Sequence, residues 1–415
     1  MDSPYARDWV EADLMEKNSL FHEHATLEIV PRAEARGKRV FRNKSVFKIK
    51  INPPGVNATV PTIEKFKVRV TIAALKKLMR PGIDYAEKRA STVRWEAVLA
   101  LLAIAAAKDL EITLFDIKTF FLYGQLRDEI YMEQVSRWVD EKFPASDFIY
   151  RLRGNLYGLP QASHIAQGSL RECLTANDTF RSTTADDCVY VRSQGKSEYV
   201  ATGTHVDDLP AVGTVSGLST LEKTLKSKFK ITAKPNPDVI MGVQIERDRA
   251  NRSIKLHQQM YVVGILHEYD MVHCKPMDTP IDPGMAKAMM LLPTDTSEPQ
   301  VRQQYQKLVG MLIWLHKTRV DLLFTINFLS RFLACATQQH FDYARGRPLR
   351  YLKGASKLGI VLKPGANVTL SAESDADWAG DLQSGRSTLG HFVQAGEQGA
   401  IACKSKLDRR VCTSV

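Results

Sequence analysis

The stretch LEITLFDIKTFFLYGQL, residues 110–126, predicts a strand that carries a carboxylate, and the expected fold is built from that strand. Leu110, Ile112 and Leu114 alternate along it, which predicts a half-buried β-strand with these side chains on one side. The next residue in that phase is Asp116, whose carboxylate is expensive to bury without a partner. Asp116 is therefore expected either at the exposed end of the strand or in a functional site.

A second strand pattern carries two more carboxylates. The sequence DDCVYVRSQGKSEYVATGTHVDDLPAVG, residues 186–213, predicts a strand, a Gly-containing turn, a strand, a tight turn at Asp207 and Asp208, and a further short strand. If the strands share one sheet, the pair lies close to Asp116. Such a cluster is typical of two-metal phosphoryl transfer, in which carboxylates hold two Mg²⁺ ions about 3.5–4 Å apart. Taken alone, the Asp-Asp pair also fits an ordinary turn, where Asp is common.

The rest of the chain predicts a mixture of helices and strands. Apolar and basic residues alternate over 44–54 and 64–72, which predicts strands with a cationic face. Two core helices are expected from helical spacing of apolar residues: Val98, Leu101, Leu102 and Ala105 in the first, and Leu218, Leu221, Leu225 and Phe229 in the second. The expected N-terminal caps are Ser91 for the first and a Ser219–Glu222 capping box for the second. Further helices are expected over 305–332 and 340–352, and strands over 148–157, 368–372 and 390–393.

The composition excludes several classes of protein. The chain has 415 residues, enough for two to four domains, and 57 Lys and Arg against 46 Asp and Glu give a net charge of +11, which favours a polyanionic partner. Its longest apolar run, residues 98–107, is about half the ~20 residues that a membrane-spanning helix needs. The N-terminus lacks the apolar stretch of a secretory signal, and the cysteines show no metal-ligand spacing. A protein of the cytoplasm or nucleus is expected, neither secreted nor bound to a membrane.

Ordered motifs over roughly residues 15 to 410 resemble the reverse transcriptase and ribonuclease H segment of a copia-type LTR retrotransposon Pol polyprotein. FDIKTFFLYGQLRDEIYMEQ (115–134) is similar to the family's DVKTAFLNGxLxxEIYMxQ, LRGNLYGLPQAS (152–163) to LxxxLYGLKQAP, and HVDDL (205–209) to YVDDL. Other similar stretches are KSVFKIK (44–50), KFKVRV (65–70), GIDYAE (82–87), LEKTLKSKFKI (221–231), MGVQIERD (241–248), CKPMDTPI (274–281), YQKLVGMLIWLHKTRVDLLFTINFLSRF (305–332), LRYLKG (349–354) and SDADWAGDLQSGRSTLGHF (374–392).

The resemblance implies the fold class. It is an α+β right-hand polymerase with fingers, palm and thumb, followed by a connection region and a truncated ribonuclease H-like α/β piece. The domains expected along the chain are 15–275 for the reverse transcriptase, 276–298 for a linker, 299–360 for a helical connection and 361–415 for the truncated ribonuclease H-like domain. The linker range is rich in Pro, Met, Asp and Thr without periodicity, as is typical of a connecting segment.

The resemblance also implies the catalytic and metal-binding residues. By position, the family's metal-binding carboxylates fall on Asp116, Asp207 and Asp208, together with the backbone of Ile117. The implied cofactor is Mg²⁺, as two ions, with Mn²⁺ as an alternative. The implied partners are an RNA or DNA template with its primer and deoxynucleoside triphosphates. The oligomeric state does not follow from the sequence.

Four further residues are implied to bind the incoming deoxynucleoside triphosphate. Lys67 and Arg69 correspond to cations that clamp the triphosphate, and Arg suits phosphate as a bidentate donor. Phe121 matches the aromatic residue that excludes a 2′-hydroxyl, and Gln161 matches a glutamine that contacts the nucleotide. Ordinary structural roles stay open for all four: a solvated strand face for the two cations, packing for Phe121 and a turn for Gln161.

Several positions depart from the family pattern. Phe120 stands where the family has Ala beside the nucleotide, and His205 replaces the Tyr before the Asp pair. Pro210 removes a ladder donor from the returning strand, so it is expected to fit only an edge or a bulge. Val320 replaces a Pro, and Pro348 is expected to break or kink a helix at a cost of about 3 kcal/mol. These departures suggest a degenerate fragment with accumulated lesions.

The C-terminal segment matches the ribonuclease H pattern only in part. Such chemistry needs about four carboxylates around two metal ions, and Asp375 matches only the first of them. Asp377 and Asp381 are better interpreted as turn residues, and the chain stops before the segment that supplies the others in the family. No ribonuclease H activity is expected from this chain, and cleavage of an RNA:DNA hybrid by the purified protein would contradict that expectation.

Three functions remain open from the sequence. The first is an RNA-directed DNA polymerase of a copia-type transposable element, a nucleotidyltransferase acting in a cytoplasmic virus-like particle or the nucleus. The second is a catalytically decayed retroelement fragment that binds nucleic acid without chemistry. The third is a metal nuclease that uses the same aspartates but does not depend on deoxynucleotides.

Overall fold

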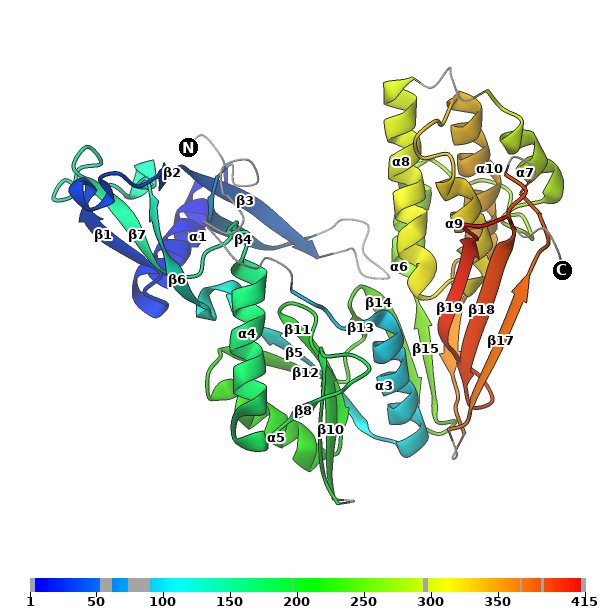
Figure 1. The fold of residues 1–415 in the computed structure, drawn as a ribbon, viewed down its shortest axis with the longest axis horizontal. Coiled ribbons are helices and arrows are strands. Elements are labelled where there is room, and N and C mark those ends of the chain that lie inside the picture. Colours follow the sequence, from blue (N-terminus) through cyan, green and yellow to red (C-terminus); the bar gives the residue numbers. More distant parts are fainter. Residues whose placement is uncertain are drawn as a thin grey trace.

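The structure is a computed structural model that describes residues 4–52, 62–73, 90–195, 197–293, 298–365, 368–381 and 384–411. The GIDYAE motif, residues 82–87, lies outside these described residues. The chain is a mixed α/β protein built mostly from antiparallel strands, with the N-terminal strands and the C-terminal helices on opposite sides of a central sheet (Figure 1). No helix in the described ranges is long and apolar enough to cross a membrane.

The central sheet has six antiparallel strands in the order β12-β5-β11-β10-β9-β8. Its strands are β5 (Glu111–Ile117), β8 (Arg181–Ser182), β9 (Val189–Gln194), β10 (Glu198–Gly203), β11 (Asp208–Gly213) and β12 (Ile231–Pro235). Side-chain alternation gives the sheet two buried faces. Ile112 and Val212 pack with helix α3 (Trp95–Lys108). Phe115 and Leu209 point to the other face, which α4 (Ala162–Thr175) and α5 (Val215–Lys226) cover.

The predicted core positions of α3 and α5 are confirmed, whereas the predicted caps are wrong. The eight apolar residues named from the sequence are all buried, although Phe229, expected in the second helix, lies just after the end of α5. However, α3 begins only at Trp95, so Ser91 lies outside the helix. Helix α5 is capped by Thr214, whose hydroxyl accepts the Gly217 N–H at 3.2 Å, instead of by Ser219. The capping residue is the one at which the helix begins after the preceding strand. A Ser-x-x-Glu motif inside the helix does not reveal that position.

The N-terminal part contains two small sheets and helix α1 (Ala6–Asn18). The four-stranded sheet, in the order β1-β7-β6-β2, consists of β1 (Leu27–Pro31), β7 (Phe148–Gly154), β6 (Gln125–Met132) and β2 (Val40–Phe41). The predicted basic strands form the antiparallel hairpin of β3 (Asn43–Asn52) and β4 (Thr62–Ile72). This hairpin packs against α1 and extends toward the central sheet (Figure 1).

The C-terminal half combines a helical core with two sheets. The four-stranded sheet contains β13 (Val239–Ile240), β14 (Val243–Asp248), β15 (Ser253–His257) and β16 (Gly359–Leu362). The helices share one buried cluster and are α6 (Gln259–Glu268), α7 (Pro283–Met290), α8 (Pro299–Trp314), α9 (Leu323–Ser330) and α10 (Gln338–Gly354). The three-stranded sheet contains β17 (Leu370–Ala376), β18 (Thr388–Ala395) and β19 (Ala400–Leu407). Helix α3 contacts β15, β16 and β19, which joins this half to the central sheet.

Two segments of this half form more regular structure than expected. The segment 276–298, expected to be a linker, contains α7, and its Met285 and Met289 are buried in the helical core. Helix α10 continues through Pro348 instead of breaking there. Pro348 is buried, and Leu349 and Leu352 of the same helix pack in the helical core, so tertiary packing offsets the missing hydrogen bond.

Candidate active site

The three predicted catalytic aspartates come together at one end of the central sheet. Asp208 is the first residue of β11 and lies directly opposite Asp116 of β5 in the strand register. Asp207 precedes it in the turn, and its backbone carbonyl accepts the Ile117 N–H at 2.9 Å. Because register partners in a sheet share a face, Asp116 and Asp208 project side by side. The shared sheet is therefore confirmed, whereas the tight turn lies one residue earlier than predicted: Val206 and Asp207 form it, and Asp208 already belongs to β11.

The turn that carries Asp207 is closed and strained. His205 and Asp208 exchange two backbone hydrogen bonds, of 2.8 Å and 3.1 Å, so only Val206 and Asp207 form the tip. Val206 adopts a φ of 59°, which is rare for a β-branched residue because its Cβ crowds the backbone. Such strain persists only where surrounding contacts hold it, and it is concentrated at functional sites.

Pro210 lies in an interior strand, so the expectation of an edge position is wrong. It pairs with Leu114 of β5, but the pairing of β11 with β10 starts only one residue later, at Thr202 and Ala211. The proline therefore stands where the ladder with β10 is interrupted. The Pro210 carbonyl accepts a hydrogen bond from the Thr202 hydroxyl at 3.1 Å. This side-chain bond replaces the backbone hydrogen bond that the interrupted ladder does not supply.

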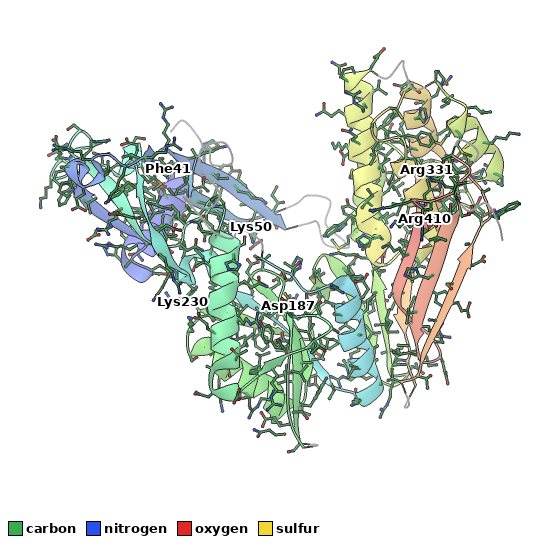
Figure 2. The ribbon with its side chains drawn as sticks, in the orientation of Figure 1. Phe41, Lys50, Asp187, Lys230, Arg331 and Arg410 are labelled. Atoms are coloured by element: carbon green, nitrogen blue, oxygen red, sulfur yellow. The ribbon has the colours of Figure 1, made fainter. Side chains whose placement is uncertain are left out.

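The aspartates are partly buried and repel one another. Burial, followed by the charges of Asp207 and Asp116, raises the pKa of Asp208 to about 6. Burial and the Asp207 charge also raise the pKa of Asp116, against the opposing charges of Lys50, Lys67 and Lys118. Figure 2 shows Lys50 near the far end of the β3–β4 hairpin, on the side of the central sheet. A bound cation would relieve this repulsion, so the donor set fits a divalent metal ion.

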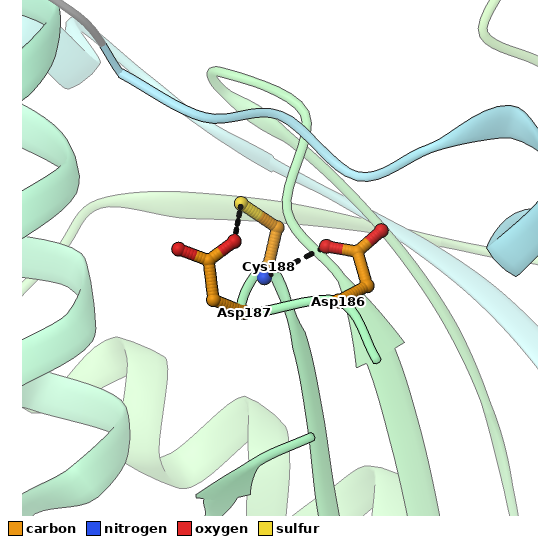
Figure 3. A group of neighbouring side chains, drawn as sticks. All are labelled: Asp186, Asp187 and Cys188. Atoms are coloured by element: carbon orange, nitrogen blue, oxygen red, sulfur yellow. Dashed lines mark hydrogen bonds between the residues drawn. The ribbon is translucent and has the colours of Figure 1, made fainter. Parts of the chain in front are cut away.

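The three carboxylates are not gathered as tightly as the ligands of one ion. Among the described residues, the only potential ligand group with all its atoms within 4.8 Å of one another is Asp186, Asp187 and Cys188 (Figure 3). That group is a turn: Asp186 accepts the backbone N–H groups of Arg94, at 2.9 Å, and Cys188, at 3.0 Å. Burial raises the pKa of the Cys188 thiol to about 11, which keeps it protonated and a poor ligand.

Lys67 and Arg69 lie on β4, on the side of the hairpin close to the aspartates. Burial and the neighbouring charge of Arg69 lower the pKa of Lys67, whereas the charge of Asp207 acts in the opposite direction. The Arg69 guanidinium lies 4.8 Å from the ring centroid of Tyr157. Phe121 packs against the same ring, with centroids 5.8 Å apart. Arg69 and Phe121 thus meet around Tyr157. Lys67 interacts electrostatically with Arg69 and with Asp207.

Gln161 faces a different cavity. Its Nε2 donates to Asp128 at 3.1 Å, and its side chain is only 3% exposed. Both residues line a cavity of about 550 Å³, whose lining also includes Arg127 and Lys228 and contains none of the three aspartates. The side-chain partner of Gln161 is thus Asp128, which is not one of the predicted site residues.

The two departures nearest the aspartates are both accommodated in the fold. Phe120 is 4% exposed and packs in the core between the central sheet and α4. Its ring also lines a cavity of about 20 Å³ with Val206 and Ser163, a space large enough for only about one water molecule. Burial lowers the pKa of His205, and its Nδ1 is buried without a hydrogen-bond partner among the described residues.

The three C-terminal aspartates have different structural environments. Asp375 is exposed on β17, at the edge of the three-stranded sheet. The turn roles expected for Asp377 and Asp381 hold: Asp377 accepts the Thr388 N–H, and the Asp381 carbonyl accepts the Gly385 N–H at 2.8 Å. In addition, the Asp381 carboxylate forms a buried ion pair of 3.3 Å with Arg331.

Sequence reasoning missed two residues of this site. Tyr157 organises Arg69 and Phe121, and Lys118 contributes charge at Asp116, yet neither was assigned a role. Lys118 lies two residues after Asp116, so the alternation of the strand could have predicted that both side chains point to the same face. Tyr157 sits in a turn motif more than eighty residues from Arg69, so only the tertiary structure reveals it.

This combination of an antiparallel sheet and a strained Asp-Asp hairpin agrees with the comparisons to known proteins. Residues 26–283 match the sequence model of the family described as reverse transcriptase (RNA-dependent DNA polymerase), and the chain belongs to that family. Members of this family act on a nucleic acid template with nucleotide substrates and divalent metal ions.

The relatives are Pol polyproteins of copia-type transposons. The chain is 30% identical over 385 residues to the retrovirus-related Pol polyprotein from transposon TNT 1-94 of Nicotiana tabacum, covering 91% of this chain and 28% of the relative. It is 32% identical over 355 residues to the corresponding polyprotein from transposon RE1 of Arabidopsis thaliana, covering 85% of this chain and 23% of the relative. The chain thus spans about a quarter of the length of these curated relatives.

Proposed function

We propose that this chain is an RNA-directed DNA polymerase that extends a primer by two-metal nucleotidyl transfer. In this reaction the primer O3′ forms a bond to the α-phosphorus of a deoxynucleoside triphosphate, and the bond from that phosphorus to the β-phosphate oxygen breaks, releasing pyrophosphate. The observation that carries the proposal is the register of the central sheet, which sets Asp208 opposite Asp116 with Asp207 at the strained hairpin tip. The family and its relatives support the same reaction.

The carboxylates of Asp116, Asp207 and Asp208, with the backbone carbonyl of Ile117, would hold two Mg²⁺ ions, or Mn²⁺ in their place. When bound, the ions would activate the 3′-hydroxyl and stabilise the leaving pyrophosphate. Until then, the raised pKa values of Asp116 and Asp208 reflect the cost of burying these acids and, after that, of holding them near other carboxylates. The strands bring these acids to one end of the sheet, and metal binding would draw the three carboxylates closer together.

The β3–β4 hairpin would bind the triphosphate through Lys67 and Arg69. The Arg69 Nε is buried without a hydrogen-bond partner among the described residues, which leaves a donor for a phosphate oxygen. Phe121 would limit space at the sugar and so exclude a 2′-hydroxyl. A nucleotide contact from Gln161 would require its side chain to leave Asp128.

In the proposed architecture the parts form a right hand. The fingers would be the N-terminal sheets, the palm the central sheet, and the thumb the remaining part of residues 15–275. Residues 276–298 would link these to a helical connection, 299–360, and to a ribonuclease H-like piece, 361–415, in which Asp375 is a vestigial carboxylate. The partners would be an RNA or DNA template with its primer, consistent with the net charge of +11.

The experiment is primer extension on poly(rA)·oligo(dT) with Mg²⁺ and dTTP. The control is the protein with Asp207→Asn and Asp208→Asn, which keeps the side-chain shapes but removes two charges. Extension by the wild type and its loss in the control support the proposal. Cleavage of the substrate without extension would instead identify a metal nuclease.

A second candidate, a catalytically decayed fragment that binds nucleic acid, is favoured by one observation. The Phe120 ring stands where relatives have a small residue, and only about 20 Å³ remains between it, Ser163 and Val206. Reverting Phe120→Ala and His205→Tyr should restore extension if these residues block an otherwise intact site. Because Phe120 is a core residue, Phe120→Ala should also lower the free energy of unfolding by about 3–5 kcal/mol, so folding must be measured in parallel. A folded revertant that stays inactive, or a wild type that is fully active, contradicts the lesion hypothesis.

A further inference from the structure

Helix α1 buries charged side chains and exposes apolar ones. Its buried residues are Ala12, Asp13 and Glu16. On the opposite side, Leu14 and Met15 are 59% and 63% exposed. Burying a carboxylate costs free energy unless hydrogen bonds or opposite charges compensate it. Because this pattern is the reverse of the usual one, we expect Asp13 and Glu16 each to form specific compensating interactions with the residues on which α1 packs.

Glu16 is bonded to the strand that carries the two predicted triphosphate-binding cations. Its Oε1 accepts the backbone N–H of Val70 at 2.9 Å, in a fully buried contact. Val70 follows Arg69 directly on β4 and is 0% exposed. The carboxylate of Glu16 thus fixes the backbone from which the Arg69 side chain projects.

The charge of Glu16 also acts on the Arg69 side chain. Arg69 and Lys67 are the cations that stabilise the carboxylate of Glu16, opposing the effect of its burial, which raises its pKa. Burial, followed by the charge of Glu16, raises the pKa of Tyr157, the residue on whose ring Arg69 lies. The charge of Glu16 therefore acts on both Arg69 and Tyr157, and the charge of Asp207 also acts on Tyr157.

We propose that Glu16 is a positioning residue that holds Arg69 against Tyr157 in the orientation that receives the triphosphate. The inference rests on the proposed function, because it assumes that Arg69 binds the triphosphate. Glu16 does not touch the substrate; it acts through the Val70 N–H bond and through its charge on Arg69. Without that charge, the Arg69 guanidinium keeps its unpartnered buried Nε but loses the nearby acid that stabilises it.

Three variants separate positioning from stability. Glu16→Gln keeps an oxygen that accepts the Val70 N–H and removes only the charge. Glu16→Ala removes both. Asp13→Asn is the matched control, since Asp13 is the other buried acid of α1 but accepts hydrogen bonds from the side chains of Arg137 and Trp138, both at 2.7 Å, whereas Glu16 accepts one from the backbone of β4.

The first measurement is binding of tripolyphosphate by isothermal titration calorimetry, which needs no catalysis. Glu16→Gln should weaken binding about tenfold with little change in Tm, as expected for loss of one charge-assisted contact. Glu16→Ala should weaken it at least as much and lower Tm. Asp13→Asn should lower Tm and leave binding within about twofold of the wild type.

The second measurement is primer extension, in which Glu16→Gln should raise the KM for dTTP about tenfold and leave kcat within about twofold. The inference is overturned if Glu16→Gln binds tripolyphosphate as well as or better than the wild type, which simple removal of a negative charge would predict. It is also overturned if Asp13→Asn weakens binding equally, or if the wild type does not bind tripolyphosphate. If the variants bind tripolyphosphate as expected but the wild type does not extend a primer, the polymerase proposal is refuted and the positioning role of Glu16 is not.

Discussion

The central sheet and the C-terminal three-stranded sheet both carry acidic residues on a strand, yet their environments differ. Asp116 and Asp208 lie on interior strands, partly buried and directly opposite each other. Asp375 lies on β17, an edge strand whose residues are all exposed, and its register partner is Gly390. Both sheets contain strand-borne carboxylates, but only the first confines them together. Confinement, more than the presence of acids, is what makes a set of carboxylates able to hold metal ions.

The largest expected effect compares one substitution in the two sheets. Asp116→Asn should reduce primer extension by about 10³-fold, because the proposed reaction would lose one of the three carboxylates that would hold the metal ions. Asp375→Asn, the matched control on β17, should leave extension within about twofold. Extension rates of the two purified proteins check this. Equal losses would mean that the difference in burial and register has no functional meaning.

A buried acid of the C-terminal region should matter for stability instead of catalysis. Asp381→Asn should lower the free energy of unfolding by about 1–2 kcal/mol, since the half-buried Arg331 then keeps its charge without its partner. Urea unfolding measures this. Adding Arg331→Met should recover part of the loss. If Asp381→Asn instead abolishes extension while stability is unchanged, the contrast between the two sheets fails.

The smallest expected effect is a pH dependence from Asp208. Its pKa rises from 3.8 to about 6 on folding, so between these values the folded chain binds more protons than the unfolded chain. The contribution of Asp208 to stability therefore falls as the pH rises from about 4 to 6. Added Mg²⁺ should raise Tm more at pH 7.5 than at pH 5, because the ion binds the deprotonated carboxylate.

Thermal unfolding with and without Mg²⁺ at the two pH values tests this prediction. Asp208→Asn should remove most of the difference in the Mg²⁺-dependent Tm shift. A shift of equal size at both pH values in the wild type would contradict the pKa assignment. Asp375→Asn again serves as the control, with an unchanged Mg²⁺ response.

Local patterns predicted the elements of this fold well. Alternation identified β3, β4, β5 and β11, and helical spacing identified the buried faces of α3 and α5. The expected helix over 305–332 is interrupted by short 3₁₀ turns between Trp314 and Leu323, where the chain changes direction between α8 and α9. Interruptions, caps and the helix α7 depend on neighbours that the local sequence does not contain.

The candidate site was predicted only in part, because some of its contacts also depend on neighbours that are distant in the sequence. The motifs identified Asp116, Asp207 and Asp208, and the structure brings them together as expected. Gln161 instead bonds Asp128, and Glu16 and Tyr157 had no signal beyond their residue type. Each of these contacts joins segments tens of residues apart, and the pairing of distant segments is not encoded by any local period.

By itself, the sequence determined many of the strands and helices, the apolar side of α3 and α5, and the carboxylates that end a strand, because periodicity and turn chemistry are local. Only the tertiary structure decided that Asp208 stands opposite Asp116, that Pro210 fits an interior strand, and that α1 turns Glu16 inward toward Arg69. Register, burial and electrostatic environment arise from contacts between distant segments, and the proposed chemistry of this protein depends on those contacts.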